Sequence, residues 1–173
     1  MGRTILWSTV SLDGFFEGPE REIDWHMVDG ELHRHFNAEL AAMGGFLDGR
    51  VTWELMAAYW PTADQDPGNA GPVAEFARSW REMPKWVFSR TLVQAGWNTR
   101  IMRDVVPAEI RELQRGTRGD LVVGGAELAA EFMRQGLIDE YRLYVQPVIL
   151  GRGIETRTFA SGVVLLRYAQ TRG

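Results

Sequence analysis

The sequence predicts an α/β fold in which helices cover both faces of a central, mostly parallel sheet. Short apolar runs alternate along the chain with segments of helical hydrophobic period, which is typical of strands joined by crossover helices. The last apolar runs follow one another with no helix between them, which predicts antiparallel C-terminal strands at an edge of the sheet. A third indication is the segment Asp120–Met133, an apolar strand that leads through two glycines into an amphipathic helix.

The elements of the first half follow from apolar runs, helical stripes and turn residues. A helix from position 29 onward is indicated by apolar residues spaced three or four apart, and Trp60-Pro61 ends the next helix. The polar stretch 62–72 is expected to be the least ordered part of the chain. The expected elements are a strand at 4–10, a helix at 29–43, a strand at 45–47, helices at 51–59 and 73–82, and a strand at 85–89.

The second half continues the alternation and then ends in strands. Proline in the first turn marks the start of a helix at Pro107. Gly136 marks the end of a second helix, which is expected at 127–135. The turn Ala160-Ser161-Gly162 predicts a terminal hairpin. The expected elements are strands at 99–102 and 121–123, helices at 107–115 and 127–135, a long strand at 141–150, and hairpin strands at 155–159 and 163–168.

Length and composition limit the classes of function. The 173 residues fit one domain over 1–173, and the net charge of -4 with no basic tract argues against a nucleic-acid partner. Because the chain has no cysteine, it has no disulfide, zinc-thiolate site or thiol nucleophile. The start shows no signal-peptide pattern and no apolar run could span a bilayer, so a soluble cytoplasmic protein is expected.

Three strand ends carry residues suited to an anionic ligand. Gly124 and Gly125 precede a helix, where glycine admits a ligand close to the backbone and the first N–H groups point at it. Arg50 and Arg90 each follow an apolar run, and a guanidinium group binds phosphate in a bidentate manner. The alternatives are glycines that serve only helix packing, and arginines that cap a helix start or lie solvated in a loop.

With these residues placed, the chain resembles the dihydrofolate-reductase superfamily. The closer resemblance is to the family of the C-terminal reductase domain of the bifunctional riboflavin-biosynthesis deaminase-reductase, as a stand-alone member. The matching segments, in order along nearly the whole chain, are Ser11–Gly14, Asp48–Glu54, Val87–Thr91, Val123–Leu128 and Gly136–Gly153. One departure is that Gly153 meets Ile154 directly, where relatives have a further loop, so residues are either deleted or absent at this join.

The resemblance implies a dihydrofolate-reductase-like fold that binds NADPH across the carboxyl ends of the strands. Gly49, Arg50 and Thr52 match a phosphate-binding motif, and Ser89 and Arg90 match the site near the adenosine 2′-phosphate. Glycines 124 and 125 match a pair under the pyrophosphate and nicotinamide, for which we expect a cis peptide. The implied cofactor-binding set is Ser11, Gly49, Arg50, Thr52, Ser89, Arg90, Thr91, Gly124, Gly125, Ala126, Glu127 and Leu128.

The resemblance also implies where the substrate and the proton source lie. Asp13 and Glu31 are the candidate catalytic acids, and Asp29 fits the register of Glu31 as well. The alternatives are a turn residue for Asp13 and an acid in the first turn of a helix for Glu31. Trp25 and His26 are candidate substrate contacts.

No metal site is expected from the histidines. His33 and His35 lie two residues apart on a predicted helix and therefore do not face one another. The better interpretation is a pair of solvated helix histidines.

The expected function is therefore an NADPH-dependent oxidoreductase that reduces a small flat heterocycle, a pterin or a pyrimidine, by hydride transfer. Two alternatives stay open: the 5-amino-6-ribosylaminouracil phosphate reductase of riboflavin synthesis, and a non-catalytic nucleotide-binding protein. The apolar strands Tyr141–Leu150 and Val163–Tyr168 predict a homodimer, since exposed sheet edges are usually covered. The expected partners are a small-molecule substrate and a second copy of the chain, with no nucleic acid and no membrane.

Overall fold

The computed structural model describes residues 2–151, 154–158 and 164–168 of the chain. Its contacts divide the chain into two compact units, one formed by residues 1–7 and 28–142 and the other by residues 8–27 and 143–173. The expected single domain over 1–173 stays a prediction. The expected break at the join of Gly153 and Ile154 lies outside the described residues, because Gly153 is not among them.

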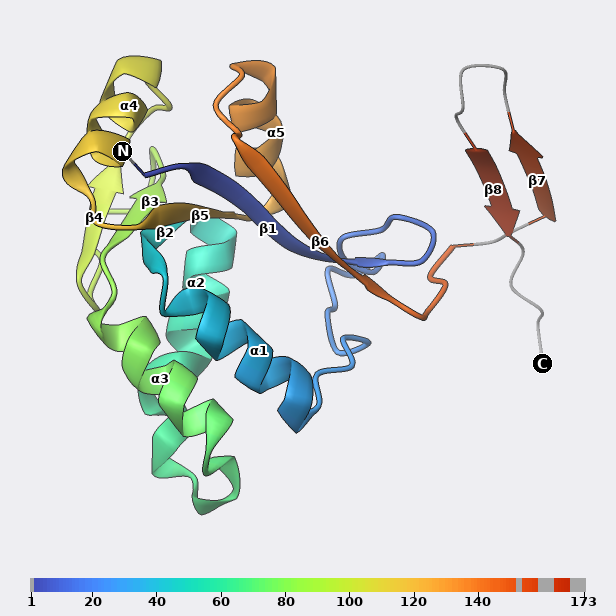
Figure 1. Cartoon of the computed structure of the whole chain (residues 1–173), viewed down its shortest axis with the longest axis horizontal. Coiled ribbons are helices and arrows are strands. Elements are labelled where there is room, and N and C mark those ends of the chain that lie inside the picture. The colour runs from blue at the N-terminus through green and yellow to red at the C-terminus, as the bar shows by residue number, and fades with distance from the viewer. Residues whose placement is uncertain (1, 152–153, 159–163, 169–173) are drawn as a thin grey trace. The chain divides into compact units, whose positions relative to one another are not determined.

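A six-stranded parallel sheet has the strand order β4-β3-β2-β5-β1-β6 (Figure 1). In the centre, β2 pairs in parallel with both β3 and β5, with Asp48 opposite Gly124. The strands are β1 (Thr4–Ser11), β2 (Met43–Gly49), β3 (Lys85–Phe88), β4 (Thr99–Met102), β5 (Asp120–Gly124) and β6 (Glu140–Gln146). The predicted α/β class is confirmed.

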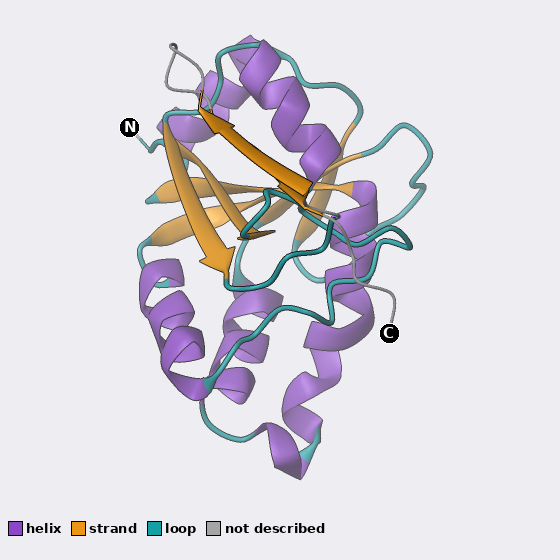
Figure 2. Cartoon of the chain, turned by 90° about the vertical axis from the view of Figure 1, so that its right-hand side faces the viewer, coloured by secondary structure: helices purple, strands orange, loops and turns teal. Residues whose placement is uncertain are grey.

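Helices cover both faces of this sheet, as predicted (Figures 1 and 2). They are α1 (Gly30–Leu40), α2 (Arg50–Tyr59), α3 (Pro72–Glu82), α4 (Pro107–Gly116) and α5 (Ala126–Arg134). Consecutive strand residues point to opposite faces, so Ile5 and Val122 pack with Trp80 of α3, and Leu6 packs with Phe132 of α5. No helix among the described residues is long and apolar enough to cross a membrane.

The antiparallel strands predicted at the edge of the central sheet are not found there. Strands β7 (Ile154–Thr158) and β8 (Val164–Tyr168) pair antiparallel with each other and form a separate two-stranded sheet. The connection explains the difference for β6, because α5 returns the chain so that β6 enters the sheet parallel. The antiparallel pairing of the last two strands is confirmed, whereas the turn predicted at Ala160-Ser161-Gly162 lies outside the described residues.

The polar stretch expected to be least ordered is instead held in place. It forms two short 3₁₀ helices, η1 (Trp60–Gln65) and η2 (Pro67–Asn69). Arg81 of α3 binds both carboxylate oxygens of Asp64, at 2.8 and 2.7 Å, and also donates to the carbonyl of Pro61. The Asn69 amide donates to the carbonyl of Ala63. These contacts supply the order that the polar composition alone did not predict.

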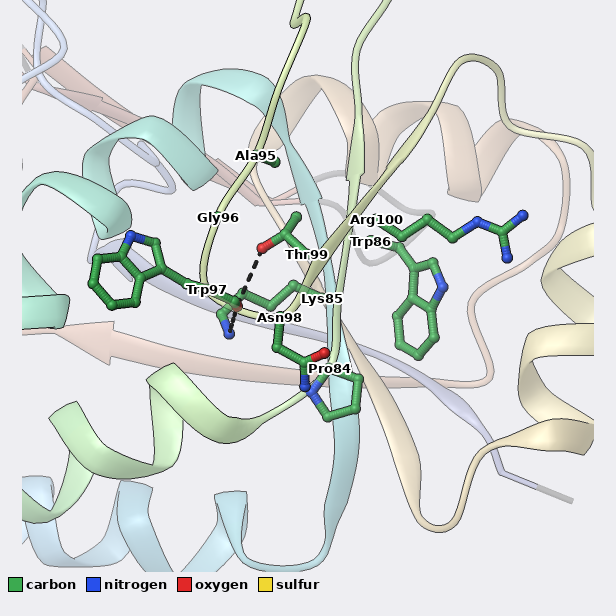
Figure 3. A pocket seen from close by; sticks show the side chains of 9 residues that line it. All are labelled: Pro84, Lys85, Trp86, Ala95, Gly96, Trp97, Asn98, Thr99 and Arg100. Carbon is green, nitrogen blue, oxygen red and sulfur yellow. Dashed lines mark hydrogen bonds between the residues drawn. The ribbon is translucent and has the colours of Figure 1, made fainter.

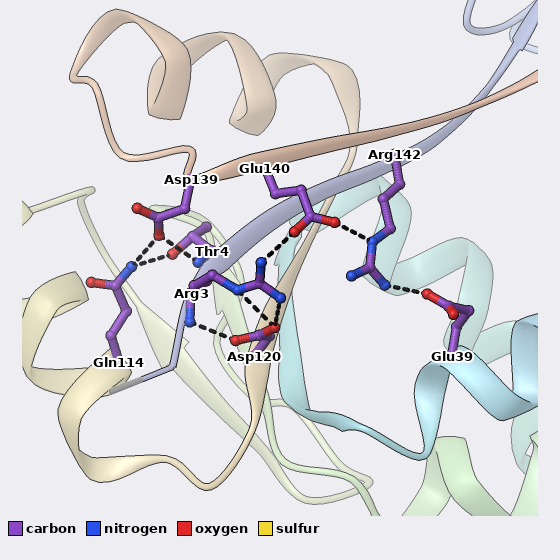
Figure 4. Close-up of polar contacts among 8 residues, drawn as sticks. All are labelled: Arg3, Thr4, Glu39, Gln114, Asp120, Asp139, Glu140 and Arg142. Atoms are coloured by element: carbon purple, nitrogen blue, oxygen red, sulfur yellow. Dashed lines mark hydrogen bonds and ion pairs between the residues drawn. The ribbon is translucent and has the colours of Figure 1, made fainter.

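A network of charges joins the amino ends of three strands (Figure 4). Arg3 pairs with Asp120 at 2.6 Å and with Glu140 at 2.5 Å, so β1, β5 and β6 are linked at their starts. Arg142 extends the network to Glu140 at 2.6 Å and to Glu39 of α1. The network therefore lies at the end of these strands opposite to their carboxyl edge.

Candidate functional site

The carboxyl edge of the sheet gathers most of the residues predicted to bind the cofactor. Strands β4, β3, β2 and β5 are neighbours and parallel, so they end at the same edge. The segments that follow them hold the predicted set of the first unit, namely Gly49, Arg50, Thr52, Ser89, Arg90, Thr91, Gly124, Gly125, Ala126, Glu127 and Leu128. Ligands of open α/β sheets bind at this edge.

Gly124 and Gly125 form a cradle with no room for side chains. A Cβ atom on Gly124 would lie 2.5 Å from Oδ1 of Asp48, and one on Gly125 would lie 2.5 Å from Oγ1 of Thr52. Gly125 also has φ of +95°, a conformation that L side chains rarely adopt. The expected cis peptide is wrong: the described residues contain no cis bond, and the positive φ of Gly125 makes the turn into α5 instead.

Two helices begin at this cradle with their N-termini uncapped by side chains. Gly49 is the N-cap of α2 and Gly125 is the N-cap of α5, and neither supplies a capping side chain. Their first N–H groups and dipoles favour an anion. Ala126 and Glu127 are exposed in the first turn of α5, whereas the following Leu128 is buried in the core.

The loop after β3 is fixed by its own hydrogen bonds. The buried hydroxyl of Ser89 accepts the N–H groups of Thr91 and Leu92, at 3.2 and 2.9 Å. Arg103, just after β4, donates to the carbonyls of Ser89 and Leu92 at 2.8 and 2.9 Å. The hydroxyl predicted to face a phosphate is therefore engaged in shaping the loop, and Arg103 is a supporting residue that the sequence analysis missed.

Both arginines predicted to bind phosphate have carboxylate partners in this structure. Arg50 pairs with Glu54 at 2.7 Å along α2, and Arg90 pairs with Asp104 at 2.5 Å. All four side chains are largely exposed, which makes such pairs weak. An incoming phosphate can therefore exchange for either carboxylate at little cost.

Asp48 lies under the cradle and is the most unusual group of the edge. Its carboxyl is buried, and its Oδ2 has no hydrogen-bond partner among the residues that the structure describes. Burial raises the pKa of Asp48 to about 7, although the positive charge of Lys85 acts in the opposite direction. The sequence analysis quoted Asp48 within a motif but did not recognise it as a site residue.

Lys85, at the start of β3, is buried as well. Its Nζ donates to the carbonyls of Met83 and Trp97, at 2.7 and 2.8 Å, and lies 4.4 Å from the centre of the Trp80 ring. Burial lowers the pKa of Lys85 to about 8, against the opposing effect of Asp48. The amine joins the end of α3 to the loop before β4.

In the second unit, Asp13 holds the chain around residue 150. Its Oδ1 accepts from the Ser11 hydroxyl at 2.7 Å and from the Leu150 N–H at 3.2 Å, and its Oδ2 accepts from the Gly151 N–H at 2.8 Å. Burial raises the pKa of Asp13, but the hydrogen bonds from Ser11, Gly151 and Leu150 outweigh it and keep the pKa below its usual value. Asp13 is therefore ionised at neutral pH and is an acceptor rather than a proton donor.

Trp25 and His26 also belong to the second unit. The Trp25 indole N–H donates to the carbonyl of Glu22 at 3.0 Å, and the two rings meet edge to face. Nε2 of His26 is buried without a hydrogen-bond partner in the part of the chain that the structure describes, and burial lowers the pKa of His26. Its ring is therefore neutral at neutral pH and keeps one unused polar atom.

Glu31 and Asp29 are separated by their roles in α1. Asp29 is the N-cap of this helix, and its Oδ1 accepts the N–H of Leu32 at 2.8 Å. Glu31 is exposed in the first turn. Of the two acids that fit the register, Glu31 is thus the one without a capping role.

The two histidines of α1 lie in different surroundings, and His35 is exposed. No group of three or more His, Cys, Asp or Glu among the described residues is arranged to hold a metal ion. His33 is half-buried and packs edge-on against Trp60 and Phe76, so the prediction that it is a solvated helix residue is wrong. Its neighbours come from η1 and α3, which the helix pattern alone could not reveal.

A surface groove of about 510 Å³ lies at the other end of β3 and β4 (Figure 3). The Trp97 indole points to one side of it, and Trp86 and Arg100 point to the other (Figure 3). Its buried amine, that of Lys85, already donates to two carbonyls. The Asn98 amide that lines it also donates to a carbonyl, that of Glu82, so the groove is a poorer candidate than the carboxyl edge.

Fold and site together define an α/β protein with two glycines and two uncapped helix N-termini at the carboxyl ends of its parallel strands. The sequence identifies the family: residues 4–172 match the RibD C-terminal domain, and the chain belongs to that family. It is 33% identical to the uncharacterized protein YyaP of Bacillus subtilis (strain 168), covering 96% of this chain and 94% of that protein.

Solved structures share the fold. A protein assigned to riboflavin biosynthesis in Shewanella sp. PV-4 has a TM-score of 0.62 at 18% identity, covering 98% of this chain and 99% of that one. A RibD structure from Acinetobacter baumannii has a TM-score of 0.56 at 16% identity, covering 88% of this chain and 48% of that one. The chain thus corresponds to about half of that RibD protein.

Proposed function

We propose that this protein is an NADPH-dependent reductase of a small nitrogen heterocycle. The single observation that supports it best is the cradle of Gly124 and Gly125 between two uncapped helix N-termini. A diphosphate fits such a cradle, because backbone N–H groups replace part of its hydration and no Cβ obstructs it. When bound, the nicotinamide supplies the hydride.

The residues of this chain divide the remaining tasks. Gly49, Gly125 and Thr52 would hold the diphosphate, and Arg90 would bind the 2′-phosphate in place of Asp104. Arg103 keeps the loop before Leu92 in shape for that contact. Ser11, Asp13, Trp25 and His26 stay proposed nicotinamide and substrate contacts, with Asp13 as an acceptor and Glu31 as the candidate acid.

Family membership favours a pyrimidine substrate over a pterin. The structures that share the fold include proteins described as acting in riboflavin biosynthesis. We therefore place the 5-amino-6-ribosylaminouracil phosphate reductase beside the general heterocycle reductase as a candidate. The same site also suits a nucleotide-binding protein without catalysis. A turnover assay distinguishes this alternative from a reductase.

The test combines binding with turnover. NADPH is titrated against the protein by fluorescence, and its oxidation at 340 nm is followed with dihydropterins and with the ribosylaminopyrimidine phosphate. Turnover of either substrate supports the reductase. Tight binding without turnover supports the non-catalytic alternative, and no binding of either NADPH or NADH rejects the proposal.

The Arg90→Ala variant is expected to bind NADPH at least tenfold more weakly and NADH with nearly unchanged affinity. Losing one charge-assisted contact to phosphate costs roughly 1.5–3 kcal/mol, and NADH lacks the 2′-phosphate. The control is Arg100→Ala, which removes an exposed arginine from β4 and should affect neither cofactor. Equal losses for NADPH and NADH in Arg90→Ala would show that Arg90 does not contact the 2′-phosphate.

We also propose a homodimer formed through β6, the edge strand of the central sheet. Tyr141, Leu143 and Val145 alternate along it and are each more than half exposed. Uncovered apolar edges favour association. Light scattering at micromolar concentration should give twice the monomer mass, and Leu143→Asp should give the monomer mass with the fold retained. A wild-type monomer would contradict this assembly.

A further inference from the structure

The buried acid at the carboxyl edge conflicts with the ligand proposed there. Asp48 is the last residue but one of β2, faces Gly124 across the β2–β5 pair, and its Oδ1 would lie 2.5 Å from a Cβ on Gly124. A carboxylate at this place would repel a diphosphate bound at the cradle. It also cannot turn to water, since the residue is only 4% exposed.

Neighbouring groups do not neutralise Asp48 by contact. Lys85 on β3 is the cation that acts on it, but its amine donates to the carbonyls of Met83 and Trp97. On α2, Arg50 is paired with Glu54. On β5 the facing residue is Gly124, and the charged group at the start of α5 is the exposed Glu127. Among the described residues, Oδ2 of Asp48 has no hydrogen-bond partner.

A proton resolves both problems at once. A protonated carboxyl has no charge to repel phosphate, and burying it in the fold costs far less than burying a carboxylate. We infer that Asp48 takes up one proton from solvent when the nucleotide binds, and that it faces the diphosphate as a neutral carboxylic acid. The inference rests on the proposed function, because it needs a nucleotide at the cradle. No bond other than the new O–H is formed, and the proton comes from the buffer.

The direction of the pH effect follows from this linkage. The pKa of Asp48 is about 7 without ligand, and a bound anion raises it further. The affinity for NADPH is therefore highest well below pH 7 and falls as the pH rises through 7. It stops falling once the pH exceeds the pKa that Asp48 has in the complex. The 2′-phosphate of NADPH has its own pKa of about 6. Measurements from pH 7 to 8.5 therefore report mainly the titration of Asp48.

The experiment is isothermal titration of the full chain with NADPH at pH 7.5, in buffers that differ in ionisation enthalpy. Wild type should take up between half and one proton per nucleotide, and its Kd should rise roughly fivefold from pH 7 to 8.5. The Asp48→Asn variant should take up almost no proton and show a flat Kd over this range. The control, Asp104→Asn, removes an exposed acid of the same edge and should keep the proton uptake of wild type.

The outcomes separate this inference from the proposed function. Binding by wild type with no proton uptake and a flat Kd overturns the role of Asp48 and leaves the reductase standing. Proton uptake that persists in Asp48→Asn also overturns it. Failure of wild type to bind NADPH at any pH rejects the nucleotide site itself. Because the wild-type measurements need no variant, the test holds even where Asp48→Asn does not fold.

Discussion

The Gly125→Ala variant should lose at least a hundredfold in affinity for NADPH while it remains folded. The new Cβ would lie 2.5 Å from Oγ1 of Thr52, and alanine would be forced to φ of +95°. Any shift that removes the contact with Thr52 or the positive φ also moves the backbone N–H groups at the start of α5. The proposed diphosphate contact depends on the position of these N–H groups. Fluorescence titration with NADPH measures the loss, and a circular dichroism melt measures the fold.

A matched control lies at the other end of the same helix. Gly136 follows α5 with φ of +63°, and a Cβ there would meet nothing within 4 Å. Gly136→Ala therefore has the backbone cost alone, about 1–2 kcal/mol, and should bind NADPH as wild type does. If both variants bind NADPH equally well, the cradle is not the nucleotide site.

Lys85→Met should destabilise the protein by about 2–4 kcal/mol at pH 10, since two buried carbonyls lose their donor. Methionine keeps most of the volume, so packing changes little. The difference should shrink towards pH 7. The pKa of Lys85 is about 8 in the folded protein, below the ordinary 10.5. The extra stability of wild type over Lys85→Met is therefore complete above pH 10.5 and is lost as the pH falls through 8.

Urea unfolding of wild type and Lys85→Met at pH 7 and pH 10 measures both effects. Arg115→Met, which removes an exposed cation from the last turn of α4, is the control and should show no such pH dependence. A destabilisation that is the same at both pH values would mean that the buried amine stays charged throughout.

The strands and helices were largely predictable because their hydrophobic periods are strong. The strand Thr99–Met102 has the predicted bounds, and the helix expected at 107–115 extends by a single residue. The long strand expected at 141–150 ends at Gln146, because an apolar run does not reveal where pairing stops. The separation of the last two strands from the central sheet could not be predicted from composition, because composition does not say which strands pair.

The candidate site was predictable where a residue type states its chemistry. Glycines at a strand end and arginines after apolar runs are residue types suited to an anion, so Gly125 and Arg90 were proposed from the sequence, and the structure places both at the carboxyl edge of the sheet. Asp48 could not, because an acid after a strand looks solvated until the neighbouring strand and helix bury it. Arg103 and Asp104 were missed since their contacts with the loop after β3 depend on the register of β3 and β4.

The buried position of Lys85 also determines when its amine can be chemically modified. It is the only lysine of the sequence, and only 1% of it is exposed. The folded surface carries its positive charge on arginine and so presents no lysine amine to acylating reagents or to conjugating enzymes. Amine-directed chemistry would reach Lys85 only in molecules that have opened around α3 and β3, and would thus distinguish folded from unfolded chains.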